Sequence, residues 1–128
     1  MLLTLFTEFE QSGEQEDLDK AISLYHDVIE LLSADHPNQS DSLNNLAISL
    51  TRRFEQSGEW EDLGKAISLH RDALKLQPAG HPNRFGSLNN LAISLTTRFE
   101  QSGEWDDLDE AISLHLDALK LRPAGHSN

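Results

Sequence analysis

The chain has 128 residues, of which 38% are hydrophobic and 25% charged, as is typical of a folded domain with one sizeable core. Ten basic and 22 acidic residues give a formal net charge of −12, which repels the phosphates of nucleic acids and anionic membrane surfaces and favours a protein partner. No cysteine is present, which excludes disulfides, a thiolate nucleophile and a Cys-ligated zinc site.

The first six residues are apolar, but they do not have the features of a targeting or membrane segment. No basic region accompanies them, and Glu8 and Glu10 interrupt the apolar stretch well before the length of a signal peptide or membrane helix is reached. We therefore expect a cytoplasmic location.

Residues 1–36 are expected to form part of a repeat unit, with a truncated first helix and a complete second one. Gly13 stands where a left-handed cap would end the first helix. Ala21, Tyr25 and Val28 then recur with helical spacing along the second helix.

Residues 37–81 are expected to form a complete unit of two helices. After Gly58, an apolar stripe with helical spacing indicates the second helix. Its first turn is acidic, as the helix dipole favours, and Pro78 closes it. The stripe consists of Leu63, Ala66, Ile67, His70, Ala73 and Leu74.

Residues 82–128 form a third unit, displaced by 45 residues from the second. Segment 42–50 recurs unchanged at 87–95, and the longer segments 41–83 and 86–128 differ at only eight of 43 positions. The first helix carries one continuous apolar stripe and ends at Gly103. That stripe consists of Leu88, Leu91, Ala92, Leu95 and Phe99.

The repeats predict an all-α protein: a right-handed α-solenoid of antiparallel helix pairs with about six helices. One hairpin cannot bury its apolar faces alone, so the units must stack into one continuous repeat domain. Small residues one heptad apart, Ala66 and Ala73, allow a neighbouring helix to approach closely.

The pattern resembles the tetratricopeptide repeat family in the long 45-residue form found in kinesin light chains and in fungal and bacterial arrays. The spacing of small, large, small and helix-ending residues matches at Ala66, His70, Ala73 and Pro78, and it recurs 45 residues later. Leu88, Leu91, Ala92 and Leu95 stand where the family pattern has Trp, Leu, Gly and Tyr, so the first helix matches in size and spacing rather than in identity.

The resemblance implies that the first helix of each unit lines a concave groove for a peptide or protein. Amides at the candidate positions can donate and accept hydrogen bonds to an extended backbone, and isoleucines one turn further on would add an apolar strip. An equally open interpretation is that one Asn of each pair bonds a neighbouring helix and sets its register. The candidates are Asn44, Asn45, Ile48, Arg52, Asn89, Asn90, Ile93 and Thr97.

Three arginines follow these positions. A clamp for acidic C-terminal tails needs paired basic groups on the groove-facing part of the helix, where this chain has Asn and Ile. Arg52, Arg53 and Arg98 lie further along, where they could meet a carboxylate, but we favour the interpretation that they belong to a solvated helix end.

The histidines and tryptophans are interpreted as structural. His36, His81 and His126 recur once per unit, too far apart to share a metal ion, so we expect no metal site and no cofactor. His70 and His115 are expected to pack in the core. Trp60 and Trp105 are expected to cover the junction between the two helices of a unit, although exposed tryptophans can also anchor a partner.

These features predict a protein-interaction scaffold with no catalytic activity. Repeated carboxylates at helix starts argue against an active site, which needs one special constellation. The alternatives are a fragment of a larger multidomain signalling protein and a spacer that self-associates end to end through residues such as Leu2, Leu5, Leu114 and Leu121.

Overall fold

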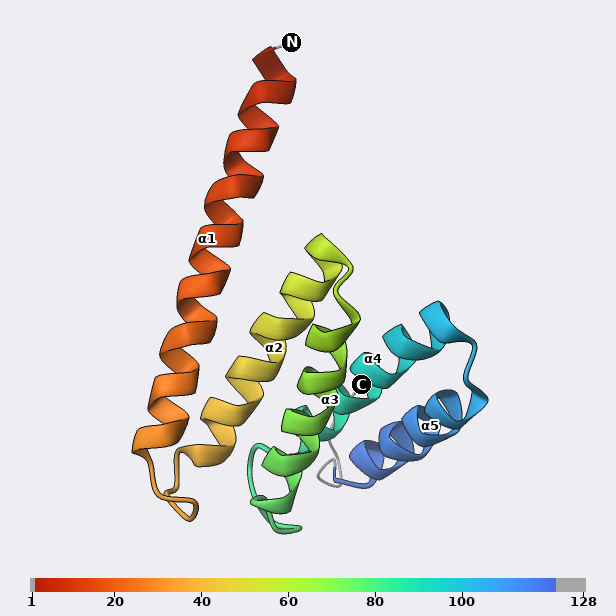
Figure 1. The fold of residues 1–128 in the computed structure, drawn as a ribbon. Helices are drawn as coiled ribbons and strands as arrows, with labels where there is room; N and C mark the ends of the chain where they lie inside the picture. Colours follow the sequence, from red (N-terminus) through yellow and green to blue (C-terminus); the bar gives the residue numbers. More distant parts are fainter. Residues whose placement is uncertain (1, 122–128) are drawn as a thin grey trace.

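The computed structural model describes the backbone of residues 2–121 and the side chains of residues 15–121. Over this range the chain is all-helical, with five helices and no strand. The helices lie side by side in chain order, each packed on its sequence neighbour (Figure 1). They are α1 (Leu2–Leu31), α2 (Gln39–Ser57), α3 (Trp60–Lys75), α4 (Arg84–Ser102) and α5 (Trp105–Lys120).

Helix α1 is one continuous helix where two were expected, so five helices are described instead of about six. In the second unit, the turn at the end of α2 is closed by Trp60, whose ring centroid lies 5.8 Å from that of Phe54. The same contact recurs between α4 and α5, at 5.2 Å. Gln15 stands at the Trp position in the first unit, so the apolar contact that fixes the turn is missing and the helix passes through residue 13.

The helix ends predicted at Gly58 and Gly103 are confirmed, α3 ends at Lys75 shortly before Pro78, and Pro123 lies outside the described residues. Gly58 and Gly103 adopt left-handed conformations, with φ of 77° and 75°, and their N–H groups donate to the carbonyls of Phe54 and Phe99 over 2.7 Å. This is the cap that glycine forms at least cost, because it has no Cβ. A single residue then separates each glycine from the acidic first turn of the next helix.

Two apolar clusters form the core. One joins α1, α2 and α3 around Ile22, Leu46 and Leu50. The other joins α2 to α5 around Leu63 and Leu91 and includes the partly buried Leu114. Leu114 is therefore a core residue instead of an end-face residue, while Leu2 and Leu5 lie outside the described side chains. The predicted small positions Ala66 and Ala73 are fully buried, and so are Ala47 and Ala92.

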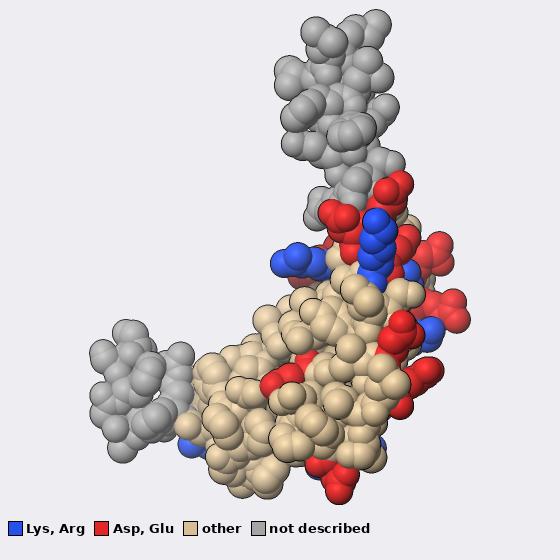
Figure 2. Space-filling view, turned by 90° about the vertical axis from the view of Figure 1, so that its left-hand side faces the viewer, with Lys and Arg blue, Asp and Glu red and all other residues tan. Residues whose placement is uncertain are grey.

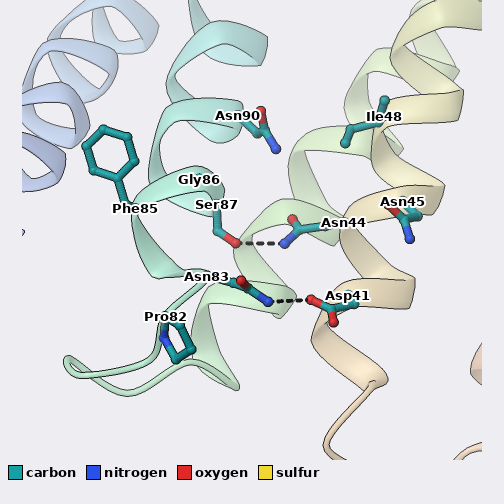
Figure 3. A pocket seen from close by; sticks show the side chains of 10 residues that line it. All are labelled: Asp41, Asn44, Asn45, Ile48, Pro82, Asn83, Phe85, Gly86, Ser87 and Asn90. Atoms are coloured by element: carbon teal, nitrogen blue, oxygen red, sulfur yellow. Dashed lines mark hydrogen bonds between the residues drawn. The ribbon is translucent and has the colours of Figure 1, made fainter.

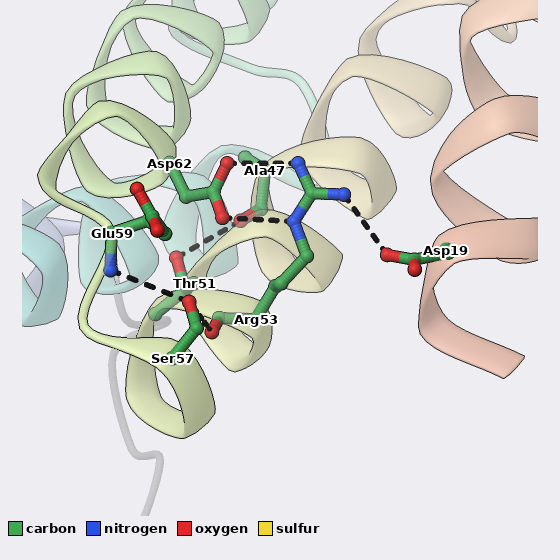
Figure 4. Close-up of polar contacts among 7 residues, drawn as sticks. All are labelled: Asp19, Ala47, Thr51, Arg53, Ser57, Glu59 and Asp62. Atoms are coloured by element: carbon green, nitrogen blue, oxygen red, sulfur yellow. Dashed lines mark hydrogen bonds and ion pairs between the residues drawn. The ribbon is translucent and has the colours of Figure 1, made fainter. Parts of the chain in front are cut away.

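Arg53 and Arg98 are partly buried and held in ion pairs instead of free at a solvated helix end, which corrects the expectation for both. The Nε and Nη2 atoms of Arg53 donate to the two carboxylate oxygens of Asp62 over 2.8 and 2.9 Å, and Nη1 reaches Asp19 on α1 at 3.0 Å (Figure 4). The hydrogen bond to Asp62 and the neighbouring charges raise the pKa of Arg53. Arg98 and Asp107 repeat the bidentate pair in the next unit. These pairs tie the end of one helix to the start of the next.

Candidate functional site

A groove lies between α2 and α4, the first helices of two consecutive units. Two adjoining hollows form it, with volumes of about 540 and 180 Å³, and Ile48 and Asn90 line both. Figure 3 shows the larger hollow, where side chains from α2 and from the start of α4 face one another.

The groove brings together six of the eight candidate residues. These are Asn44, Asn45, Ile48, Arg52, Asn90 and Ile93. Asn89 and Thr97 do not line either hollow. The hydroxyl of Thr97 instead donates to the carbonyl of Ile93 on its own helix, at 2.9 Å.

The amide of Asn44 is occupied by contacts inside the protein. Its Nδ2 donates to the hydroxyl of Ser87 on α4 over 2.7 Å, and its Oδ1 lies 2.9 Å from Nδ1 of His70 on α3. All three residues are buried. Desolvation lowers the pKa of His70 to about 4, so the ring is neutral at physiological pH and the nitrogen facing Asn44 can carry its proton. Asn44 therefore bonds two neighbouring helices, which is the contact that the second of the two interpretations expects.

The neighbouring positions offer a free surface. Among the described residues, no hydrogen bond of the side chain of Asn45 or Asn90 is found. Ile48 is 39% exposed and Ile93 55% exposed. The groove therefore presents unpaired amides beside an apolar strip, which suits an extended segment with both backbone polar groups and apolar side chains.

Sequence reasoning did not single out several residues that line the groove. Asp41 and Asn83 meet across its open end, where Asn83 Nδ2 donates to Asp41 Oδ1 over 2.8 Å (Figure 3). Glu55 and His70 line the smaller hollow together with Arg52. One signal was available for Asp41, because this is one of the few positions at which the last two units differ.

Three of the described histidines, His36, His70 and His81, have hydrogen-bonding contacts inside the protein. Nδ1 of His36 accepts the N–H of Asn38 and Nδ1 of His81 accepts that of Asn83, each at 3.0 Å, so both organise the turn before a helix. His70 is buried as expected, but His115 is exposed because no described helix packs over its side of α5. His126 lies outside the described residues. Within the described part, no group of three or more His, Cys, Asp or Glu residues is arranged to hold a metal ion.

Charge is unevenly distributed over the surface. On the face seen in Figure 2, carboxylates gather along the upper right edge, whereas uncharged side chains cover most of the lower part. Trp60 and Trp105 remain about half or more exposed even though each packs on a phenylalanine. Among the described helices, none is both long and apolar enough to cross a membrane.

Comparison with known proteins matches one segment of the chain to a family. Residues 40–83 match the family described as tetratricopeptide repeat. This segment takes in α2, α3 and the loop that leads to α4. No curated protein matches the chain.

Proposed function

Because residues 40–83 match the tetratricopeptide repeat family, whose members generally mediate protein–protein interaction, we propose that the chain is an interaction scaffold that binds an extended peptide in the groove between α2 and α4. The observation that carries the proposal is the combination of free amides and exposed isoleucines in one groove. Isoleucines on a helix normally pack against a neighbouring element or are surrounded by charged side chains.

The groove is suited to an extended occupant because it is long, open and lined by side chains that require no particular partner sequence. Asn45 and Asn90 belong to different helices, so a peptide can hydrogen-bond to both units at once. The isoleucines at 48 and 93 provide apolar contact beside them. Arg52 adds one positive charge at the far end of the groove.

The test is selection of binders from a random peptide library displayed on phage, followed by affinity measurement by fluorescence anisotropy. The double variant Ile48→Ser/Ile93→Ser should weaken the selected peptides by about tenfold or more, since two apolar contacts are lost. Ile112→Ser is the matched control, because Ile112 is similarly exposed but lies on α5 outside the groove. Equal binding to the two variants would place the binding site elsewhere.

A second candidate function, end-to-end self-association, is favoured by the exposed face of α5. Ile112, Leu116 and Leu119 are 50–56% exposed there. In α3 the equivalent positions are Ile67, Arg71 and Leu74, and this side of α3 packs against α4. A face that seats a helix in one unit is thus uncovered in the next.

Light scattering coupled to size-exclusion chromatography tests this candidate. If the α5 face joins copies, the mass should grow with protein concentration, and Leu116→Arg, which installs the residue of the preceding unit, should shift it toward the monomer. Leu24→Arg on α1, at a similarly exposed leucine, is the control. A constant monomer mass over the concentration series would rule out self-association.

A further inference from the structure

The groove between α2 and α4 carries opposite charges at its two ends, and these charges are special to this junction. The last two units differ at eight of the 43 positions that can be compared. Three of these positions line the groove: Asp41, Arg52 and Pro82, which are replaced by Gly86, Thr97 and Ser127 one unit later. Two of the three differences add a charge to the groove, a carboxylate at Asp41 and a guanidinium at Arg52.

Both charges remain available to a ligand. Asn83 bonds only one oxygen of Asp41, and the carboxylate is exposed in the larger hollow. Arg52 is exposed in the smaller hollow, and among the described residues it has no ion pair or side-chain hydrogen bond. This separates Arg52 from Arg53, whose guanidinium is held by Asp62 and Asp19.

The spacing along α2 fixes the length of the complementary segment. Asp41 and Arg52 are 11 residues apart on one helix, which at 1.5 Å per residue is about 16 Å. An extended peptide advances about 3.3 Å per residue and its successive side chains point to opposite faces, so side chains two and four residues apart can enter the groove together. Four residues span about 13 Å, and long basic and acidic side chains at the two ends reach the remaining distance to Asp41 and Arg52. The side chain midway between them lies on the same face, toward Ile48, which is about 10 Å from Asp41 along the axis.

Resting on the peptide-binding function above, we propose that the groove selects an extended peptide with a basic and an acidic side chain four residues apart and an apolar side chain midway between them. The basic group lies at Asp41, the apolar group at Ile48 and Ile93, and the acidic group at Arg52. The peptide follows the axis of α2 along the groove. This occupant is chosen by charge complementarity at both ends of the groove and by the apolar strip at its middle.

Glu55 modulates the acidic end. It lies one turn beyond Arg52 and lines the same hollow, so its carboxylate opposes the acidic group of the peptide. Unlike Arg52, Glu55 has a counterpart in the next unit, Glu100, and is part of the repeated surface. Glu55→Gln should therefore strengthen binding of the acidic end.

Four synthetic nonapeptides with a Ser/Gly framework test the proposal by fluorescence anisotropy. All have leucine at the fifth position. The third and seventh positions carry arginine and glutamate in the mixed peptide, two arginines in the basic peptide, two glutamates in the acidic peptide and two glutamines in the neutral peptide. We expect the mixed peptide to bind about tenfold more tightly than the neutral one at low salt, and the advantage to shrink as salt is added.

Variants of the chain test which end of the groove prefers which charge. Asp41→Lys makes both ends basic and should turn the preference toward the acidic peptide, while Arg52→Glu should turn it toward the basic peptide. Asp41→Gly and Arg52→Thr introduce the residues of the next unit and should each reduce the advantage of the mixed peptide about threefold. Arg71→Leu is the charge control, since it also introduces the residue of the next unit but lies outside the groove, where Arg71 pairs with Glu110.

The outcomes separate the two proposals. Equal binding of all four peptides, unchanged by the variants, would overturn the charge preference and leave the peptide-binding groove intact. If library-selected peptides bind the groove but the mixed peptide does not, the charge preference is wrong as well. If neither the nonapeptides nor any library peptide binds, both proposals fall.

Discussion

Asn44 and Asn89 occupy the same position in consecutive units but have different surroundings. The buried amide of Asn44 connects Ser87 on α4 to His70 on α3, so one side chain links two units. Asn89 is half-buried, and no hydrogen bond of its side chain to another described residue is found. Chemical identity at a repeated position therefore does not imply an identical role.

This difference predicts unequal effects of the same substitution. Asn44→Ala leaves the hydroxyl of Ser87 and the ring of His70 without their partner in a buried site, so we expect it to lower the free energy of unfolding by about 1–3 kcal/mol. Asn89→Ala should change it by less than about 0.5 kcal/mol. Urea denaturation followed by circular dichroism measures both. Equal losses would show that Asn44 gains nothing from its two contacts.

The buried ring of His70 makes stability depend on pH. Its pKa is about 4, against 6.5 for an ordinary histidine, so between these values the unfolded chain binds a proton that the folded chain does not. The stabilising contribution is complete above pH 6.5 and is lost as the pH falls toward 4, by up to roughly 3 kcal/mol.

Substituting His70 should therefore flatten the dependence of stability on pH. We expect His70→Gln to reduce the slope of unfolding free energy between pH 6.5 and pH 4 relative to the unsubstituted chain. His115→Gln, at the exposed equivalent position in α5, is the matched control for the substitution itself. An unaltered slope in the His70 variant would mean that the ring is protonated in the folded chain.

The sequence could place these residues on a helix but could not assign their partners. The leucine stripe showed that both members of the Asn pair lie near the edge of the buried face, and successive residues differ by about 100° around a helix. Which member turns inward depends on where α4 packs, and the partner Ser87 is 43 residues away. For that reason the sequence alone could not distinguish the free amide of Asn45 from the hydrogen-bonded amide of Asn44.

At the scale of elements, glycine has opposite effects at two nearby positions. Gly58 has a φ of 77° at the end of α2, whereas Gly64 lies inside α3. At neither position would an added Cβ meet an atom within 4 Å. The effect of a substitution on stability is therefore decided by the local backbone conformation and not by clashes with neighbouring residues.

We therefore expect the same substitution, glycine to alanine, to change the free energy of unfolding in opposite directions at these two positions. Gly58→Ala should lower the free energy of unfolding by about 1 kcal/mol, because alanine is strained at positive φ. Gly64→Ala should raise it by about 0.5–1 kcal/mol, because alanine loses less backbone entropy in a helix. Thermal or urea unfolding of the two variants measures this. Two changes of the same sign would contradict the assignment of Gly58 as a left-handed cap.

Helix boundaries were predictable where a local signal and a tertiary contact agree. Gly58 and Gly103 end helices, and each is followed by a tryptophan that packs back on a phenylalanine. At Gly13 the glycine is present without the tryptophan, and α1 continues. Glycine in a helix costs only about 1 kcal/mol, so it does not end one by itself. The carboxylates that hold Arg53 and Arg98 were likewise missed because they were attributed to the helix dipole alone.

At the scale of the whole molecule, every helix packs mainly on its neighbours in the chain. α1 contacts α2 and α5 contacts α4, while the middle helices have neighbours on both sides. Stability in such an arrangement is a sum of unit terms and nearest-neighbour terms, so parts of the molecule can open separately. The contact between α3 and α4, with the Asn44 bridge above it, is the boundary between the second and third units.

Native-state hydrogen exchange can detect this boundary. In the unsubstituted chain we expect the amides of α2 and α3 to be protected most and those of α5 least, because α5 has one neighbouring helix and an uncovered apolar face. Asn44→Ala weakens the link across the boundary, so α4 and α5 should lose protection together and to a greater degree than α1. Asn89→Ala supplies the control and should leave the pattern unchanged. A uniform loss of protection over all five helices would instead mean that the units unfold as one cooperative body, and that the boundary between them is structural but not energetic.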